Sequence, residues 1–462
     1  MSAPQKTQRT QSRSIDCQLQ NTNCKVLIAE FAICNLHFAF CIVKFPLRVL
    51  CVLCGSFLFS AVGASAAPQD IVPLDGEAFA GELVSIGMDG HVTFRVVTED
   101  RSPGEPRTLQ LDQLVRWGHP VAARPQLITV LADGGRLVAA ADWSGGAAVR
   151  LDGDMVVVLS ASFEEVRLPR GAVRGVVFAQ RSHPAERAAL AERVQRFRGN
   201  EDAVFLTNGD RLAGKLTELV GGSLTMATAA GSAKLPLSRV EAVALADSRQ
   251  PAADHPPGGA RHQPQVVVGL RDGSLLYAIA VRGDQDELVI EMANGVKLSG
   301  ESVDDVVALQ TAGGRFVYLS DLEPAAYRHV PYFDVAWPYQ RDRNVLGEPL
   351  VVRGKRYLKG LGMHSAARLT YRLDGEYRRF DAAVAVDDSA EGLGSVTFGV
   401  YVLRDSEWQE AYKSDIVRGG DAPVPVAVDV SDAQGLTLTV DYADRGDELD
   451  RAMWLDARLV KQ

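Results

Sequence analysis

The sequence contains no cysteine after residue 54. All six cysteines of the 462-residue chain lie near its start: Cys17, Cys24, Cys34, Cys41, Cys51 and Cys54. The rest of the chain can therefore form neither a disulfide framework nor a cysteine-based zinc site. Any domain in that region must be held together by the burial of apolar side chains.

Familiar catalytic signatures are also missing. The sequence has no Gly-x-Ser-x-Gly elbow, no His-Glu-x-x-His helix and no phosphate-binding loop, and no cysteine nucleophile follows residue 54. A glycosidase needs two carboxylates across a cleft, and 58 acidic residues supply such pairs by chance. Enzymes of that class normally bring a barrel of ~250 residues, for which the repeats described below leave no room. We therefore expect a protein that is not an enzyme.

The charge balance is acidic, with 58 Asp and Glu against 49 Lys and Arg and a net charge of −9. Residues 1–66 carry six basic and two acidic side chains, so the remainder has a net charge of −13. A surface of that sign repels phosphate backbones. Nucleic acid is therefore not an expected partner.

Residues 1–66 read as a leader. Lys44 and Arg48 precede an apolar run at 49–62, and Ala64-Ser65-Ala66 follows it, which is the order of a secretory signal peptide. The alternative is a retained membrane anchor, but the run is shorter than the ~20 residues of a spanning helix. We expect cleavage after Ala66, no membrane span afterwards, and a secreted, periplasmic or cell-envelope location. The leader is unusually long, which suggests a true translation start near Val43.

Four divergent copies of one small unit are predicted between the leader and residue 312. Two copies occupy 67–181, the third 201–247 and the fourth 265–312. Each opens with a short apolar run and a Gly turn of the kind that favours hairpins. The turns are Leu74-Asp75-Gly76-Glu77, Ala132-Asp133-Gly134-Gly135, Thr207-Asn208-Gly209-Asp210 and Arg271-Asp272-Gly273-Ser274.

A second signal closes each copy. Two apolar residues recur five positions apart, as Leu109 and Leu114, Leu168 and Val173, Leu235 and Val240, and Leu298 and Val303. The space between turn and closing pair holds four or five short strands, which predicts a small SH3-like or Sm-like β-barrel for each copy. A continuous β-rich scaffold whose turns share glycine is the alternative. The repeats could also dock a protein partner.

Two segments separate these copies. Residues 182–200 predict one connecting helix, because Leu190, Val194 and Phe197 lie at helical spacing between Pro184 and Gly199. Residues 248–264 are rich in proline and have hardly any large apolar side chain, which predicts a flexible linker.

Residues 313–462 predict an all-β sandwich. Leucine and tyrosine alternate with polar residues in 369–373, as in a strand with one wet face. Asp374-Gly375 supplies a turn before a second strand at 377–386, and 396–402 and 436–440 repeat the pattern. No amphipathic helix is evident there, so two packed sheets are expected.

Several separated blocks of this region resemble the NPCBM/NEW2 family, a group of carbohydrate-binding modules in secreted proteins. The blocks stand in the family's order: Tyr357-Leu358-Lys359-Gly360-Leu361-Gly362-Met363-His364-Ser365, Leu369–Phe380, Val384–Asp388, Gly394–Val400, Leu436–Val440 and Ala452–Leu459. The resemblance implies a galactose-binding-like jelly roll and non-catalytic binding of glycans. The sequence departs from the family at Ala385, where glycine is usual, and at Arg404-Asp405-Ser406, where an Asp-Gly turn is expected.

Aromatic side chains near polar residues are the candidates for sugar contact, because sugars present apolar C–H faces rimmed by hydroxyls. Trp337, Tyr339 and Trp408 stand beside polar residues and turn signals, and Tyr357 lies in the motif itself. The resemblance implies a role for His364, whose neutral imidazole can donate and accept hydrogen bonds. A buried histidine that fixes its own loop is the alternative.

Carboxylates complete the candidate set. Asp387 is a candidate sugar ligand at a strand end. Asp388 and Asp456 could hold a structural calcium ion, which prefers six to eight oxygen ligands, although surface carboxylates that bind nothing are common. The expected function is thus glycan binding by an exported protein. The alternatives are a cell-envelope scaffold without sugar binding and an accessory part of a glycoside hydrolase system.

Overall fold

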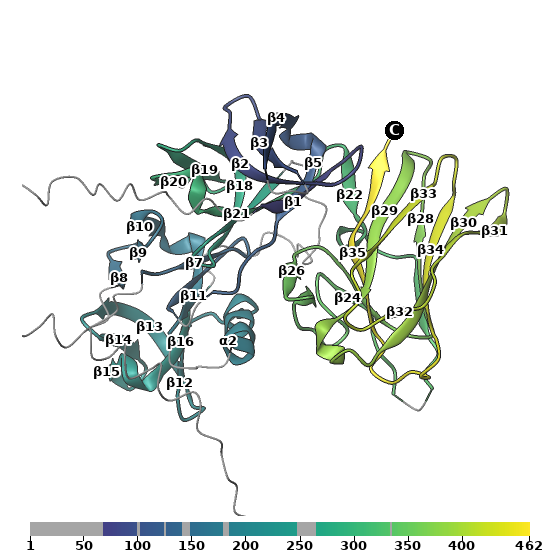
Figure 1. The fold of residues 1–462 in the computed structure, drawn as a ribbon. Coiled ribbons are helices and arrows are strands. Elements are labelled where there is room, and N and C mark those ends of the chain that lie inside the picture. The colour runs from purple at the N-terminus through teal and green to yellow at the C-terminus, as the bar shows by residue number, and fades with distance from the viewer. Residues whose placement is uncertain are drawn as a thin grey trace, which may run out of the picture. The chain divides into compact units, whose positions relative to one another are not determined.

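The computed structural model describes residues 68–98, 102–123, 126–140, 148–178, 184–246, 265–332 and 335–462. The predicted leader and the predicted linker lie outside these residues. The regular structure of the described chain is nearly all β, with one α-helix, α2 (Pro184–Gln195), which confirms the predicted all-β class (Figure 1). No helix in this part of the chain combines the length and apolar character that a bilayer crossing requires.

Before residue 313 the described chain repeats one order of elements. Each run ends with a 3₁₀ turn and a closing strand. The first run comprises β1 (Gln69–Pro73), β2 (Phe79–Ile86), β3 (His91–Val97), β4 (Pro103–Gln110), η1 (Leu111–Gln113) and β5 (Leu114–Gly118). The second comprises β6 (Ile128–Leu131), β7 (Arg136–Val138), β8 (Val149–Asp152), β9 (Met155–Ser160), β10 (Glu164–Pro169), η2 (Arg170–Ala172) and β11 (Val173–Val177).

The second run has one more strand than the first, and the third and fourth runs follow the order of the first. The third comprises β12 (Asp202–Leu206), β13 (Arg211–Val220), β14 (Ser223–Thr228), β15 (Gly231–Pro236), η3 (Leu237–Arg239) and β16 (Val240–Ala244). The fourth comprises β17 (Gln265–Leu270), β18 (Leu275–Gly283), β19 (Leu288–Met292), β20 (Lys297–Gly300), η4 (Val303–Asp305) and β21 (Val306–Ala312).

Strand pairing also recurs. In the first, third and fourth runs the first strand pairs with the second and the last, and the second, third and fourth strands pair in succession. The closing strands pair between runs, β5 with β21 and β11 with β16. The order of strands is the one that the barrel prediction requires, while closure of each run into a barrel stays a prediction.

The predicted turn glycines lie in the first turn of each run. Gly76, Gly134, Gly209 and Gly273 have φ values of 95°, 97°, 89° and 94°. Glycine adopts this region without the steric cost that a Cβ imposes. The turns that the sequence singled out therefore have one backbone conformation.

The closing pairs are placed as expected in three runs. Leu114, Val173 and Val240 each open the last strand. In the fourth run Val303 lies instead in the 3₁₀ turn η4, and Val306 opens β21. The difference arises because β20 ends two residues before its 3₁₀ turn, whereas the strands at the same place in the other runs end directly before theirs.

Helix α2 packs on strands of the second and third runs. Leu190 and Val194 are buried against apolar residues of β6, β11, β12 and β16. The helix ends at Gln195, before the predicted end at residue 198, and Phe197 instead meets Phe205 edge to face, with 6.5 Å between ring centroids. Its apolar face is thus covered within the chain.

Residues 316–462 form two antiparallel sheets. In one, β24 (Gln340–Arg341), β27 (Gly360–His364), β35 (Arg451–Lys461), β29 (Tyr377–Val386) and β33 (Val424–Asp429) lie in that order, and β22 (Phe316–Tyr318) also pairs with β35. The other has the order β23 (Ala326–His329), β28 (Ala367–Arg372), β34 (Gly435–Tyr442), β30 (Ser395–Arg404) and β31 (Glu407–Lys413), and β32 (Val417–Arg418) pairs with β30. A separate hairpin joins β25 (Leu350–Val352) and β26 (Lys355–Tyr357).

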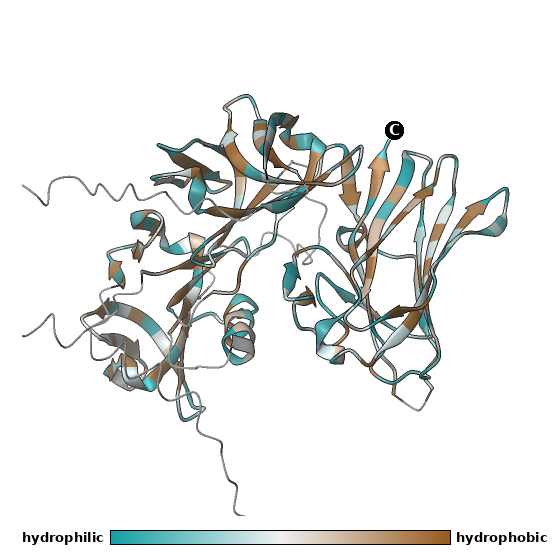
Figure 2. Ribbon diagram, viewed as in Figure 1, coloured by the Kyte–Doolittle hydropathy of each residue, from teal (hydrophilic) through white to brown (hydrophobic). Residues whose placement is uncertain are grey.

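Apolar side chains fill the space between these sheets. Leu369 and Tyr371 of β28 are buried while Arg368 and Arg372 are exposed, which confirms the alternation in the sequence. Trp454 is fully buried and meets Phe380 and Phe398 at centroid distances of 6.0 and 5.2 Å. Figure 2 accordingly shows hydrophobic residues, in brown, along the strands.

A buried ion pair joins β5 to β35. Arg116 Nε donates to Asp456 Oδ2 at 3.0 Å, and both side chains are 7% exposed. Gln310 donates to Asp456 Oδ1 and to the hydroxyl of Tyr318, each at 3.0 Å. Every oxygen of this carboxylate thus has a donor, as a buried charge requires.

We predict that Asp456→Ala lowers the free energy of unfolding by about 3–5 kcal/mol, because it leaves the guanidinium of Arg116 buried without its carboxylate. Urea-induced unfolding of the full chain measures the change. The matched control is Asp152→Ala, which breaks the exposed pair with Arg167 and should cost at most about 1 kcal/mol. Similar small losses in both variants would contradict the importance of the buried pair.

Candidate functional site

One hollow lies at the end of β27, between the connection that follows β23 and the connection that precedes β35. Its volume is about 260 Å³. We call it the Trp337 hollow, and its lining residues are His329, Tyr332, Val335, Trp337, Val345, His364, Asp447, Leu449 and Arg451. Predicted site residues Trp337 and His364 both belong to it.

The glycines of the motif explain how β27 reaches this position. Every residue from Gly360 to His364 is buried, and β27 pairs with β24 and β35. A Cβ on Gly362 would lie 2.4 Å from the backbone oxygen of Arg343 and 2.7 Å from Cα of Asn344. Glycine therefore lets residues 343–344 cross directly over β27.

Trp337 and His364 stack in parallel, with ring centroids 5.1 Å apart and an interplanar angle of 6°. The backbone on both sides of the indole is fixed. The N–H of Trp337 donates to Nδ1 of His329 at 3.2 Å, and the hydroxyl of Tyr327 donates to its carbonyl at 2.6 Å. His329 also meets His364 edge to face at 5.9 Å. The aromatic wall is thus held in place before a ligand arrives.

Both imidazoles favour the neutral form. Burial, followed by the neighbouring His329, lowers the pKa of His364 to about 4. Burial also lowers the pKa of His329. A neutral imidazole offers one donor and one acceptor, and Nδ1 of His364 lies 3.4 Å from Oγ of Ser365. His364 as a whole is 6% exposed, so most of the residue is buried, as in the alternative of a histidine that fixes its own loop.

Another part of the lining comes from the connection between β34 and β35. It supplies Asp447 and Leu449, and β35 begins with Arg451. Leu449 has φ of 55°, a left-handed conformation that is costly for a residue with a Cβ. Arg451 donates to the carbonyl of Ser389 at 2.6 Å, which fixes its side chain at the rim. This part of the lining therefore places a carboxylate and a guanidinium beside the aromatic rings.

Asp387 is not among the residues that line the hollow. It is 1% exposed. Its Oδ1 accepts from Asn344 Nδ2 and from the N–H of Ser389, and its Oδ2 accepts from the N–H of Val351, each at 3.0 Å. The prediction that Asp387 contacts sugar stays a prediction, while in the structure its carboxylate binds Asn344, Val351 of β25 and the turn that follows Asp387 itself.

Three further candidates lie outside the hollow lining. Tyr339 packs on Tyr327 at 5.1 Å, two residues beyond Trp337. Tyr357 is buried against His119, with ring centroids 4.7 Å apart. Trp408 is 47% exposed on β31 and its ring tip lies beside Gly435. The structure does not bring these three side chains to Trp337 and His364.

The proposed calcium ligands do not fit a calcium site. Asp388 accepts from the N–H groups of Arg353 and Gly354 at 2.7 and 2.8 Å, and Asp456 is bound to Arg116 and Gln310. Calcium requires converging oxygen ligands, whereas these oxygens face N–H donors. Within the described ranges, no group of three or more His, Cys, Asp or Glu side chains is arranged to hold a metal ion.

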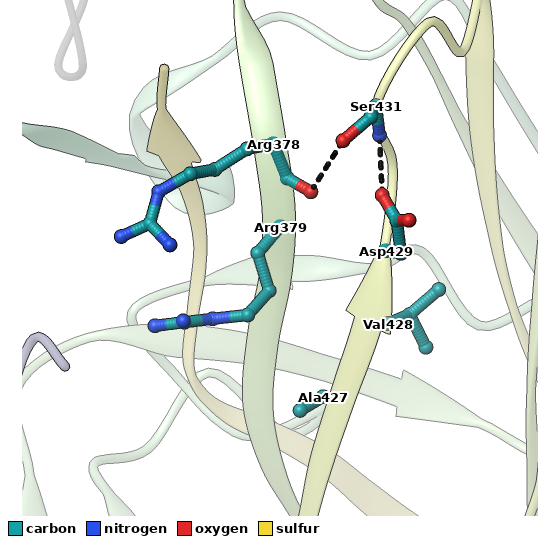
Figure 3. Close-up of a pocket in the computed structure, with 6 residues that line it drawn as sticks. All are labelled: Arg378, Arg379, Ala427, Val428, Asp429 and Ser431. Atoms are coloured by element: carbon teal, nitrogen blue, oxygen red, sulfur yellow. Dashed lines mark hydrogen bonds between the residues drawn. The ribbon is translucent and has the colours of Figure 1, made fainter. Parts of the chain in front are cut away.

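A second hollow, of about 280 Å³, lies over β29 and β33. Figure 3 shows Arg378, Arg379 and Asp429 around it, with Oγ of Ser431 donating to the carbonyl of Arg378. The guanidinium groups of Arg378 and Arg379 are engaged by Asp75, at 2.6 and 3.1 Å. This hollow has no aromatic lining, so it is the weaker candidate for a sugar.

Of the residues that line the Trp337 hollow, the sequence predicted Trp337 and His364 as site residues and not the others. His329 and Tyr332 lie close to Trp337 in the sequence, and their clustering with Pro331 was an available signal. Asp447, Leu449 and Arg451 carry no periodic pattern and reach the hollow only through the return of β35 beside β27.

Asp450, which precedes Arg451, generates a pH prediction. Its side chain is fully buried, its Oδ1 accepts from the N–H of Ser395 at 3.0 Å, and its Oδ2 has no hydrogen-bond partner among the described residues. Burial raises the pKa of Asp450 to about 6, from 3.8. The folded chain therefore binds this proton more tightly than the unfolded chain, and the free energy of unfolding should fall as pH rises from about 4 to about 6.

We predict that Asp450→Asn removes this part of the pH dependence. Urea unfolding at pH 4, 5, 6 and 7 gives the difference between the two proteins, which should shift in favour of the variant as pH rises. A difference that stays constant over this range would contradict the assignment.

The comparisons with known proteins concern the same region. A protein of Renibacterium salmoninarum, named as a candidate endo-alpha-N-acetylgalactosaminidase, is 26% identical over 114 residues, which cover 25% of this chain and 7% of that protein. Alpha-1,3-galactosidase B of Akkermansia muciniphila is 29% identical over 119 residues, which cover 25% of this chain and 14% of that enzyme. The chain thus spans a small part of the curated relatives it matches.

Among solved structures, the chain is similar to CBM51 from Clostridium perfringens GH95 in complex with methyl-galactose. The identity is 25%, the TM-score is 0.28, and the match covers 31% of this chain and 99% of that one. The CBM51-2 and INT domains of Clostridium perfringens ZmpB, in complex with GlcNAc, match with 24% identity and a TM-score of 0.28, over 39% of this chain and 37% of that one. Residues 315–460 match the family model of the NPCBM/NEW2 domain, as the sequence motifs predicted.

Proposed function

We propose that residues 313–462 bind a glycan without cleaving it, and that the Trp337 hollow is the binding site. The observation that carries this proposal is the stacked pair of Trp337 and His364 at the wall of a hollow that also presents Asp447 and Arg451. Aromatic rings contact the C–H faces of a sugar, and planar polar groups bond to its hydroxyls. The match to the NPCBM/NEW2 domain supports the same function.

The size of the hollow suits one sugar ring. Its volume of about 260 Å³ lies just below the ~300–1,000 Å³ of sites for drug-sized ligands. The neutral imidazole of His364 can donate to one hydroxyl or accept from it, while the carboxylate of Asp447 accepts and the guanidinium of Arg451 donates. We propose a neutral hexose of the galactose type, because the named relative from Akkermansia muciniphila is a galactosidase.

The chain itself is proposed to be non-catalytic. Asp387 and Asp450 are both buried and do not line the hollow. Asp447 is the acidic side chain that lines it. A glycosidase needs an acid and a second carboxylate across the scissile bond. We expect no release of reducing sugar from a polysaccharide that the protein binds.

Export is part of the proposal, because glycans on cell surfaces lie outside the cytoplasm and the leader has the order of a signal peptide. We predict a mature chain that begins at Ala67. Sequencing of the N-terminus of the protein isolated from its native host tests this, and a mature chain that starts well before Ala64 would contradict it.

We predict that the full chain binds galactose-containing glycans on an array and that Trp337→Ala or His364→Ala weakens binding at least about tenfold, which corresponds to about 1.4 kcal/mol. Trp337→Ala removes the aromatic wall, and His364→Ala removes its polar edge. Trp408→Ala is the matched control, since it deletes an exposed tryptophan outside the hollow and should leave binding unchanged.

Folding of each variant is checked by urea unfolding, so that loss of binding is separated from loss of structure. Binding should persist in a calcium chelator, because the candidate calcium ligands are occupied by N–H donors. Absence of glycan binding by the folded full chain would contradict the proposal and favour the alternative of a cell-envelope scaffold.

A further inference from the structure

Two tyrosines outside the sequence blocks that resemble the NPCBM/NEW2 family meet at the rim of the Trp337 hollow. Tyr332 is 61% exposed and lines the hollow, and Tyr442 is 47% exposed at the end of β34. Their ring centroids lie 6.3 Å apart at an angle of 85°. The pair is therefore formed by two elements that are far apart in the sequence.

Burial does not account for this pair. Other tyrosines of the sandwich, such as Tyr318 and Tyr371, are 1% exposed and contribute to packing. Tyr332 and Tyr442 are instead largely exposed, and the exposed Val335 lines the hollow together with Tyr332. An exposed apolar patch beside a hollow is a feature of ligand-binding surfaces.

The geometry of the pair suits a ring. The two aromatic planes stand at nearly a right angle. The face of one ring can therefore contact the C–H side of a sugar, while the edge of the other ring limits the position of that sugar. Each phenol adds a hydroxyl that can donate and accept hydrogen bonds. Asp447, on the loop that follows Tyr442, adds an acceptor near the boundary with the hollow.

We propose that Tyr332 and Tyr442 form a second sugar subsite, so that the protein recognises two linked sugar residues instead of one terminal sugar. This inference rests on the proposed function of the Trp337 hollow, which holds one ring. Tyr332 belongs both to the Trp337 hollow, which it lines, and to the second subsite, because its ring contacts that of Tyr442. The glycan would pass from the hollow over Tyr332 to Tyr442.

The test compares methyl galactoside and methyl N-acetylglucosaminide with N-acetyllactosamine, the disaccharide of the two sugars, by calorimetric titration of the full chain. Wild type should bind the disaccharide about three- to tenfold more tightly than the better monosaccharide, which is the range expected for one aromatic contact. Tyr442→Ala should abolish this ratio and leave the monosaccharide affinity unchanged. Tyr442→Phe should retain most of the ratio if the ring carries the contact.

Trp408→Ala is the control, because it removes an exposed aromatic ring that belongs neither to the Trp337 hollow nor to the pair of Tyr332 and Tyr442. Binding of a monosaccharide with no gain for the disaccharide would overturn the second subsite and leave the proposed function intact. The same ratio in wild type and in folded Tyr442→Ala would also overturn it. Binding of none of the three sugars would overturn both the subsite and the galactose-type ligand.

Discussion

The pairing of β35 with β27 and β29 is the constraint on which the site depends. β35 begins with Arg451 at the Trp337 hollow, carries Trp454 into the core between the sheets, and continues to Asp456. The register with β29 shifts between Asp381 and Ala383, and Asp456 has φ of 48°. A bulge of this kind redirects a side chain, and here the carboxylate of Asp456 reaches Arg116 of β5.

The Trp337 hollow combines rigid strands with irregular loops. β27 brings His364 to its end, where the crossing of residues 343–344 over Gly362 leaves no room for a Cβ. The loop beyond that crossing is held by the buried carboxylate of Asp387. Hydrogen bonds to the N–H and to the carbonyl of Trp337 fix the backbone of the residue whose indole stacks on His364. Preorganisation of this kind lowers the entropic cost of binding a ligand.

The sequence allowed much of the fold to be predicted because strands and turns leave local signals. Alternation in β28 and the glycines in the first turns of the repeats, such as Gly209, reflect backbone geometry within a few residues. His364 could be assigned from its motif, and Trp337 from its polar surroundings. The start of the last strand in the fourth run was not marked by the closing pair, because Val303 lies in the 3₁₀ turn and Val306 begins β21.

The surroundings of several other candidate residues could not be predicted, because they come from contacts distant in the sequence. Asp387 resembles a surface carboxylate next to Asp388, yet it is buried by donors from residues 344 and 351. Trp408 is exposed, as expected for a sugar contact, but β31 places it outside the hollow. Tyr442 carries no local signal, because its ring contact with Tyr332 joins two distant parts of the sequence.

The most direct test of the account is a titration of the full chain with a galactose-containing glycan, followed by NMR of the indole N–H groups of its five tryptophans. Variants assign each signal. The account predicts that the signal of Trp337 shifts with added glycan while those of Trp408 and of the buried Trp454 stay in place. A shift of Trp408 without one of Trp337 would contradict the site.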